Sequence, residues 1–189
     1  MTTSISFQNA IGQSVLIIGD VGAGKTQLTV RLVDEAIAAG MQEHITIIDM
    51  APTTRFVGSL KIGGQLREMA PHLTIVRYLA PSRIETPRLS ARTPQELQHL
   101  IALNQQRITP LLHTFLNAPS SILCINDVSL YLQSGSLALV TQAIRATDTC
   151  IVNGYYGQSI QTEIEAPISS IERALMNRLS ESMDIVITL

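Results

Sequence analysis

The chain has 189 residues, of which 46% are hydrophobic and 15% are charged, and its formal net charge at pH 7 is −2. This composition excludes a disordered chain, and the small net charge argues against nucleic-acid or anionic-lipid binding. No segment approaches the roughly 18 apolar residues of a membrane span, and the first residues lack the pattern of a secretory signal. We therefore expect a single cytoplasmic domain over residues 1–189, with no membrane or nucleic-acid partner.

Short apolar runs rich in valine and isoleucine recur along the chain. They lie at residues 14–19, 45–49, 73–79, 121–127, 149–154 and 184–189. Nearly all of their residues are apolar, which is typical of strands buried on both faces of a parallel sheet. Cys124 and Cys150 fall within two of these runs, so we expect both to be core thiols.

Helical spacing of apolar residues appears between the runs. It predicts one helix over 25–39 and a second over 96–116, in which Thr109-Pro110 either kinks the helix or begins another. Shorter helices are expected over 137–145 and after Ser169, which would form a capping box with Glu172. The alternation predicts an α/β three-layer sandwich, with a mostly parallel sheet of about six strands and helices on both faces.

Two connections, 50–72 and 80–94, are longer than the common length of about 4–6 residues, so we expect a substrate site or a lid there. The second carries Arg83, Arg88 and Arg92 among prolines. Arginine forks grip phosphates and carboxylates, so this loop would suit an anionic small molecule, a protein partner, or a subunit boundary in a homo-oligomer. A solvated surface loop is the alternative.

A glycine-rich loop follows the first predicted strand and precedes the first predicted helix. It matches the pattern G-x-x-x-x-G-K-[ST], and its residues are Gly19, Asp20, Val21, Gly22, Ala23, Gly24, Lys25 and Thr26. Glycines let such a loop turn its backbone N–H groups toward phosphate oxygens, and the helix N-terminus adds partial positive charge. Lys25 would neutralise the β- and γ-phosphates, and the Thr26 hydroxyl would bind Mg²⁺. A turn with a solvated lysine is the alternative.

In this context the loop resembles the phosphate-binding loop of the P-loop nucleoside triphosphatase superfamily. The resemblance implies the P-loop fold, with a nucleotide at the carboxyl ends of the parallel strands. It covers the whole strand–helix alternation, although only the loop is a specific match. The sequence contains no Asn-Lys-x-Asp run, which contacts guanine in GTPases, so we expect ATP and Mg²⁺ as the cofactors.

Members of that superfamily end another apolar strand with an aspartate that holds Mg²⁺, often followed by a glutamate that orients the attacking water. Here the strand ends in Asn126-Asp127. If the pair aligns with Asp-Glu, an amide replaces the metal-side acid and a shorter acid replaces the catalytic one, so hydrolysis would be slow. If Asp127 faces the metal, the water-positioning acid comes from elsewhere. We favour the second interpretation; a cap for the following segment is the alternative.

Two more polar residues end predicted strands. Asp49 is the best remaining candidate for a catalytic acid, although it would also suit a turn cap or a pair with Arg55. In the RecA-like division of the superfamily a polar residue in the place of Asn153 senses the γ-phosphate; the alternative is a turn asparagine before Gly154. The catalytic candidates are Lys25, Asp49, Asp127 and Asn153, and the metal candidates are Thr26 and Asp127.

Three functions fit these residues. The first is a slow Mg²⁺-dependent ATPase. The second is an ATP-using group transferase, because residues 121–189 are similar in outline to the ATP:corrinoid adenosyltransferases. That family typically has a lysine where Ala23 stands and an Asp-Glu pair where Asn126-Asp127 stands. The third is a nucleotide-sensing module with little hydrolysis.

Overall fold

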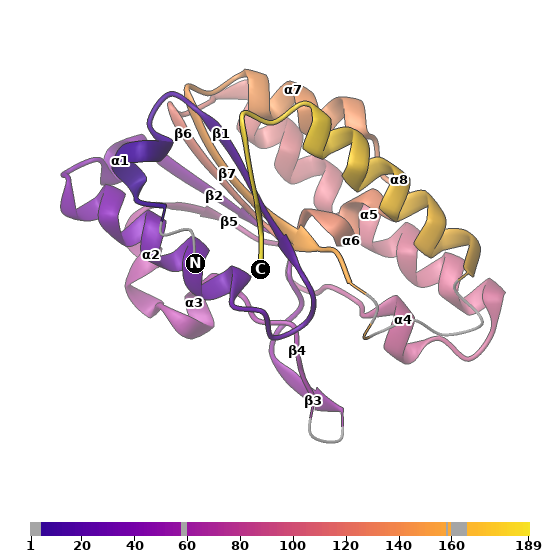
Figure 1. Ribbon diagram of the computed structural model, residues 1–189. Helices are drawn as coiled ribbons and strands as arrows, with labels where there is room; N and C mark the ends of the chain where they lie inside the picture. Colours follow the sequence, from indigo (N-terminus) through magenta and orange to yellow (C-terminus); the bar gives the residue numbers. More distant parts are fainter. Residues whose placement is uncertain (1–4, 58–59, 158, 160–165) are drawn as a thin grey trace.

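The six-stranded sheet at the centre of the molecule is parallel throughout, in the order β5-β2-β6-β7-β1-β8 (Figure 1). The structure is a computed structural model that describes residues 5–57, 60–157, 159 and 166–189. The strands of the sheet are β1 (Ser14–Gly19), β2 (Ile45–Asp49), β5 (Arg77–Leu79), β6 (Ile122–Asn126), β7 (Thr149–Tyr155) and β8 (Ile185–Thr188). The predicted α/β fold is confirmed.

Helices cover both faces of this sheet because successive strand residues point to opposite sides. Val15 and Ile17 of β1 pack in one core with the first helical layer, whereas Leu16 and Ile18 pack in a second core with the other layer. The first layer comprises α1 (Phe7–Ala10), α2 (Lys25–Ala38) and α3 (Leu66–Met69). The second comprises α5 (Pro94–Asn117), α6 (Val128–Leu132), α7 (Leu137–Arg145) and α8 (Ala166–Glu181). The expected three layers are therefore present.

Helix α5 is one element with Pro110 inside it, so of the two alternatives at Thr109-Pro110 the start of a second helix is excluded. Ile108 and Leu112, on either side of Pro110, are both fully buried in the second core. Their packing holds the helix together where Pro110 removes one backbone hydrogen bond. The N-terminus of α5 is capped, since the Thr93 side chain accepts a hydrogen bond from the Glu96 backbone N–H.

Two local predictions differ from the structure. Helix α8 begins at Ala166, so Ser169 lies inside the helix and does not cap it, and Glu172 instead points to partners described below. The strand predicted over 73–79 is shorter than expected: its first residues belong to a 3₁₀ helix, η2 (Pro71–Ile75), and only β5 (Arg77–Leu79) is a strand. Tertiary contacts outweighed the local pattern in both places.

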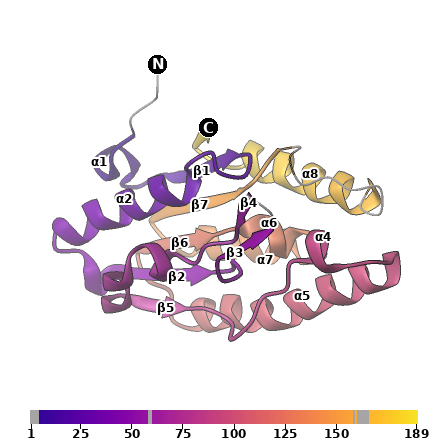
Figure 2. The ribbon, with the colours of Figure 1, turned by 90° about the horizontal axis from the view of Figure 1, so that it is seen from below.

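The two long connections are not irregular throughout. The first contains an antiparallel hairpin of β3 (Arg55–Val57) and β4 (Leu60–Ile62), which extends from the carboxyl end of the sheet away from both helical layers (Figures 1 and 2). It also contains α3 and η2, and the second connection contains α4 (Pro87–Ser90). These short elements position the residues that border the site.

Strand β7 lies between β1 and β6, so the carboxyl ends of these three strands adjoin at one edge of the sheet. The glycine-rich loop follows β1, and Asp127 follows β6. No helix in the described part of the chain is both long enough and apolar enough to cross a membrane.

Candidate functional site

The glycine-rich loop, residues 19–26, is tied together by its own lysine. Nζ of Lys25 donates hydrogen bonds to the carbonyl oxygens of Gly19, at 3.0 Å, and Asp20, at 2.6 Å. Gly22 and Gly24 have φ values of 76° and 94°, in the left-handed region that side chains disfavour. This backbone curls the loop around the space that the lysine borders.

The start of helix α2 offers hydrogen-bond donors to that space. No acceptor among the described residues takes the backbone N–H of Gly22, Lys25 or Thr26, whereas the N–H of Ala23 bonds to Asp20 O at 3.3 Å. Orphan N–H groups at a helix N-terminus, with the partial positive charge of the helix dipole, favour an anion. The loop is therefore built to bind one.

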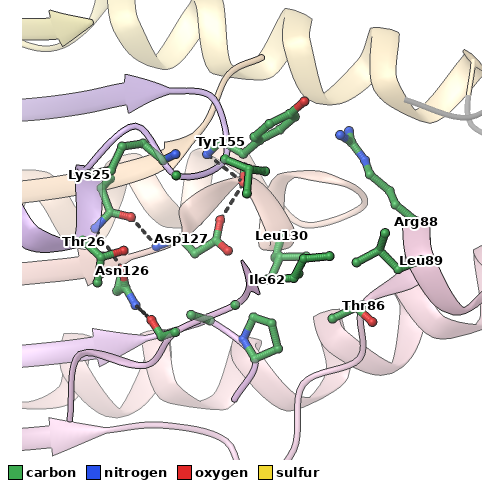
Figure 3. Close-up of a pocket in the computed structure, with 18 of the residues that line it drawn as sticks. Lys25, Thr26, Ile62, Thr86, Arg88, Leu89, Asn126, Asp127, Leu130 and Tyr155 are labelled. Carbon is green, nitrogen blue, oxygen red and sulfur yellow. Dashed lines mark hydrogen bonds between the residues drawn. The ribbon is translucent and has the colours of Figure 1, made fainter. Parts of the chain in front are cut away.

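A cavity of about 270 Å³ opens beside the loop and is shared by both helical layers. The loop contributes Lys25 and Thr26 to its wall, and β6 contributes Asn126 at its end. In Figure 3, Lys25 and Thr26 lie on one side of Asp127, and Arg88 and Leu89 lie on the other. Both long connections also line the cavity, as expected for a substrate site.

Asp127 adopts a left-handed conformation, φ 60° and ψ 54°, and is the sole non-glycine residue with positive φ in the described segments. Two contacts hold it there. Its backbone N–H donates to Oδ1 of Asn153 at 2.9 Å, and its carboxylate accepts a hydrogen bond from the Ser129 hydroxyl at 2.7 Å. Because β6 ends at Asn126, this turn lets Asn126 and Asp127 both reach the cavity, so neither excludes the other.

Opposite charges face one another across the polar end of the cavity. Burial raises the pKa of the Asp127 carboxyl, while the hydrogen bond from Ser129 and the charges of Lys25 and Arg88 act to lower it. Burial likewise lowers the pKa of Lys25, against the charges of Asp127 and Asp20. Neither charge is fully compensated by its surroundings, which suits a ligand carrying both an anion and a cation.

A buried chain of polar side chains runs along the carboxyl ends of three strands. Nδ2 of Asn153 donates to Oδ1 of Asn126 at 2.9 Å and to the Thr29 hydroxyl at 2.8 Å. Nδ2 of Asn126 donates in turn to Oδ1 of Asp49 at 2.8 Å. Asn153 therefore connects the loop helix, β6 and the backbone of Asp127, in the position where a γ-phosphate sensor was expected.

Comparison with known proteins supports the fold. No protein-family model matches the chain, and no curated protein matches it by sequence. The flagellar accessory protein FlaH from Methanocaldococcus jannaschii is similar in structure, with a TM-score of 0.53 and 11% identity over 95% of this chain and 71% of that one. The DnaC helicase loader gives a TM-score of 0.41 and 15% identity over 95% and 80% of the two chains. The assignment depends on the first similarity and on the loop.

The chain has the fold of the P-loop nucleoside triphosphatases. The glycine-rich loop stands where that fold has its P-loop, at the carboxyl end of β1 and the start of α2, and we call it the P-loop below. The fold also explains why functional candidates from distant parts of the sequence meet at this edge, since parallel strands bring their carboxyl ends together.

Asp49 lies behind the P-loop site and does not line the cavity. Its side chain is fully buried and accepts hydrogen bonds from Asn126, from the Tyr78 hydroxyl, and from the backbone N–H groups of Leu66 at 2.7 Å and Ala51 at 3.1 Å. Burial raises the pKa of the Asp49 carboxyl against these four donors. This geometry matches a turn cap; a pair with Arg55 is not formed, because Arg55 bonds to Ser90 at 3.0 Å. Its predicted catalytic role has no support in this position.

Of the three arginines in the second connection, Arg88 alone lines the cavity. Its guanidinium pairs with Glu172 of α8 at 2.8 Å and lies 5.3 Å from the centre of the Tyr155 ring. Arg83 points to solvent and pairs with Glu85. The Arg92 backbone N–H bonds to Glu96, and the residue does not reach the cavity. The expected arginine cluster is thus reduced to one residue.

Several residues of the site have no signal in the sequence. Gln133 and Glu172 line the cavity, and Nε2 of Gln133 donates to Glu172 at 3.0 Å. Gln133 directly follows α6 and Glu172 lies in α8, and neither belongs to a recognisable motif. Ser129 was detectable in principle, because a hydroxyl two residues after an aspartate commonly bonds to it in a turn.

The P-loop site has few protein ligands for a metal. No group of three or more histidine, cysteine, aspartate or glutamate side chains is placed to hold a metal ion within the described residues. Thr26 and Asp127 both line the cavity, and Mg²⁺ commonly binds through one or two such groups together with phosphate oxygens. The residues present therefore fit a metal that arrives with a nucleotide.

Proposed function

We propose that the protein binds Mg²⁺-ATP at the P-loop and hydrolyses it slowly. The observation that carries the proposal is Lys25, which spans its own loop to Gly19 and Asp20 while the N–H groups of Gly22, Lys25 and Thr26 are left to an external acceptor. A polyphosphate tail supplies such acceptors. ATP is preferred to GTP because the guanine-contacting run is missing from the sequence.

The loop backbone and four polar side chains have roles in this proposal. Backbone N–H groups of residues 19–26 cradle the phosphates, and Lys25 neutralises charge on the β- and γ-phosphates. Thr26 and Asp127 would hold the metal, which neutralises charge on the phosphates when bound. Asn153 holds the backbone of Asp127 and so orients its carboxylate.

We expect slow hydrolysis because few carboxylates lie at the polar end of the cavity. Asn126 is an amide whose nitrogen and oxygen are both engaged, and Glu172 is paired with Arg88. Asp127 is then the acid left at the polar end, and it cannot both hold the metal and position the attacking water. A second acid, supplied by a partner or another copy of the chain, would accelerate the reaction.

A nucleotide-sensing module is the second candidate. It is favoured by Asn126 at the carboxyl end of β6. An amide there, in place of an acid, weakens metal binding and hydrolysis but leaves phosphate binding by the P-loop intact. Transfer of an adenosyl group remains a prediction from the sequence, and so does a homo-oligomeric or protein partner at the second connection. No described contact favours adenosyl transfer.

Calorimetric titration with Mg²⁺-ATP tests nucleotide binding. Lys25→Ala should weaken binding at least about tenfold, because a charged hydrogen bond contributes roughly 1.5–3 kcal/mol. Arg145→Ala is the matched control, since Arg145 is exposed at the end of α7 and outside the cavity. Absence of heat with the unaltered protein, or equal losses in the two variants, would contradict the proposal.

A single-turnover assay separates hydrolysis from sensing. We expect slow turnover that Asp127→Asn abolishes while nucleotide binding without metal is retained. If the unaltered protein binds Mg²⁺-ATP but leaves it intact over hours, the ATPase proposal fails and the sensing module stands.

A further inference from the structure

The cavity continues past Asp127, away from the P-loop. We call this part the distal pocket and define it by Ile62, Leu89, Leu130, Gln133 and Glu172, which all line the cavity. Figure 3 labels the first three of them. Lys25 and Asp127 mark the polar end, where the proposed function places the terminal phosphates. A triphosphate held by the P-loop therefore leaves the distal pocket for something else.

The walls of the distal pocket are apolar and electrically balanced. Ile62, Leu89 and Leu130 supply aliphatic surface. The two charged groups there, Arg88 and Glu172, are only 6% and 5% exposed and pair with each other at 2.8 Å. An anion would meet repulsion from Asp127 and the nearby triphosphate, and a cation would lose its hydration against aliphatic walls. A neutral occupant meets neither penalty.

Gln133 carries a buried side-chain acceptor in this wall that has no partner among the described residues. Gln133 is 6% exposed, and its Nε2 donates to the Glu172 carboxylate at 3.0 Å. Because a carboxylate only accepts hydrogen bonds, this contact fixes the orientation of the amide and turns Oε1 away. Oε1 accepts no hydrogen bond from any described residue. A buried acceptor without a partner is unfavourable, and a ligand that donates a hydrogen bond to it would recover that cost.

We propose that the distal pocket binds a second small molecule, a neutral and largely apolar alcohol, beside the nucleotide. Its apolar body packs against Ile62, Leu89 and Leu130, and its hydroxyl donates to Oε1 of Gln133. The position of this ligand next to the terminal phosphate rests on the proposed nucleotide site, but its binding to the pocket does not.

Four related probes distinguish the ligand classes: 2-phenylethanol, its methyl ether, phenylacetate and 2-phenylethylamine. Their dissociation constants are measured with the full chain by NMR titration of its methyl groups, with and without saturating Mg²⁺-ADP. We expect 2-phenylethanol to bind tightest and the methyl ether, which cannot donate, about fivefold more weakly. Tighter binding of phenylacetate or the amine, or no binding of any probe, would overturn the proposal.

Two variants locate the site. Gln133→Met keeps the length of the side chain without the acceptor and should remove the preference for the alcohol over the ether, whereas Leu89→Trp should fill the pocket and abolish binding of both. Unchanged binding in both variants would place the probes elsewhere and overturn the proposal.

Nucleotide binding is measured in parallel to separate the two proposals. Lys25→Ala should lose Mg²⁺-ATP and still bind 2-phenylethanol. Probe binding without nucleotide binding would refute the proposed function alone, and the reverse result would refute the distal pocket alone. Displacement of the probe by Mg²⁺-ADP would show that the nucleotide itself fills the pocket, which also overturns the proposal of a second ligand.

Discussion

Asp49 and Asn126 are paired in register at the carboxyl ends of β2 and β6, and the Asn126 amide donates to the Asp49 carboxylate at 2.8 Å. The carboxylate lies on the strand that does not reach the cavity, and the amide lies on the strand that does. If the pair Asn126-Asp127 aligns with the Asp-Glu pair of the superfamily, this arrangement puts an amide in place of the metal-side acid; in the alignment that we favour, that acid is Asp127. Asp49 instead orients Asn126, and through it Asn153.

Exchanging the two side chains tests that relationship. Asn126→Asp alone should lower the free energy of unfolding by about 3 kcal/mol at pH 7, because it places two buried carboxylates side by side. Adding Asp49→Asn should recover at least half of the loss, since the new amide donates to the new carboxylate. Urea denaturation of both single variants and the double variant measures this coupling, and strictly additive losses would contradict it. The double variant should also hydrolyse Mg²⁺-ATP faster than the unaltered protein.

Removing the Tyr78 hydroxyl should have a pH-dependent cost. Burial raises the pKa of Asp49 above its usual 3.8, and the hydrogen bonds from Tyr78 and Asn126 oppose that rise. The folded chain thus holds this proton more tightly, so the contribution of Asp49 to stability is fully present below pH 3.8 and falls as pH rises through the folded pKa. In Tyr78→Phe the pKa of Asp49 rises further, so the fall is larger and extends to higher pH.

We therefore expect Tyr78→Phe to cost about 2 kcal/mol at pH 7, where the lost hydrogen bond served a charged acceptor, and less near pH 4. Urea denaturation from pH 4 to pH 8 supplies the comparison. Equal costs at both ends of that range would show that Asp49 does not change its protonation state there.

The Arg88–Glu172 pair should be far more important for stability than the exposed Arg83–Glu85 pair. Arg88→Met removes the buried guanidinium that pairs with Glu172, so we expect a loss of about 3 kcal/mol. Arg83 is 72% exposed, and Glu85 keeps Arg107 at 2.9 Å, so Arg83→Ala should cost less than about 1 kcal/mol. Thermal unfolding of the two variants measures the stability that each one loses. Comparable losses would mean that the buried pair is solvated.

Asn153 should affect hydrolysis more than nucleotide affinity. Asn153→Leu removes the acceptor that holds the Asp127 backbone in its left-handed turn and the donor to Asn126. Thr29→Val is the matched control, because it removes one of the contacts of Asn153 and leaves the Asp127 contact intact. Single-turnover rates and Mg²⁺-ATP dissociation constants are measured for both. Equal loss of rate in the two variants would refute a specific role in positioning Asp127.

Much of the architecture was predictable because parallel strands buried on both faces need continuous apolar runs, and the segments 14–19, 45–49 and 121–127 stand out for that reason. The P-loop was predictable because its chemistry needs glycines and a lysine at adjacent positions. The predicted capping box at Ser169 was wrong, and the sequence left open whether Pro110 begins a second helix, because buried contacts of α8 and α5 outweigh local signals.

The sequence by itself determined the P-loop, the strand–helix alternation and the candidate acids at the strand ends, because each depends on residues that are neighbours in the chain. The tertiary structure alone decided which candidates meet. Asp49 is buried behind Asn126, and Arg83 and Arg92 lie outside the cavity. Gln133 and Arg88 both contact Glu172. Such contacts join segments far apart in sequence, and only the packing of both helical layers against the sheet determines them.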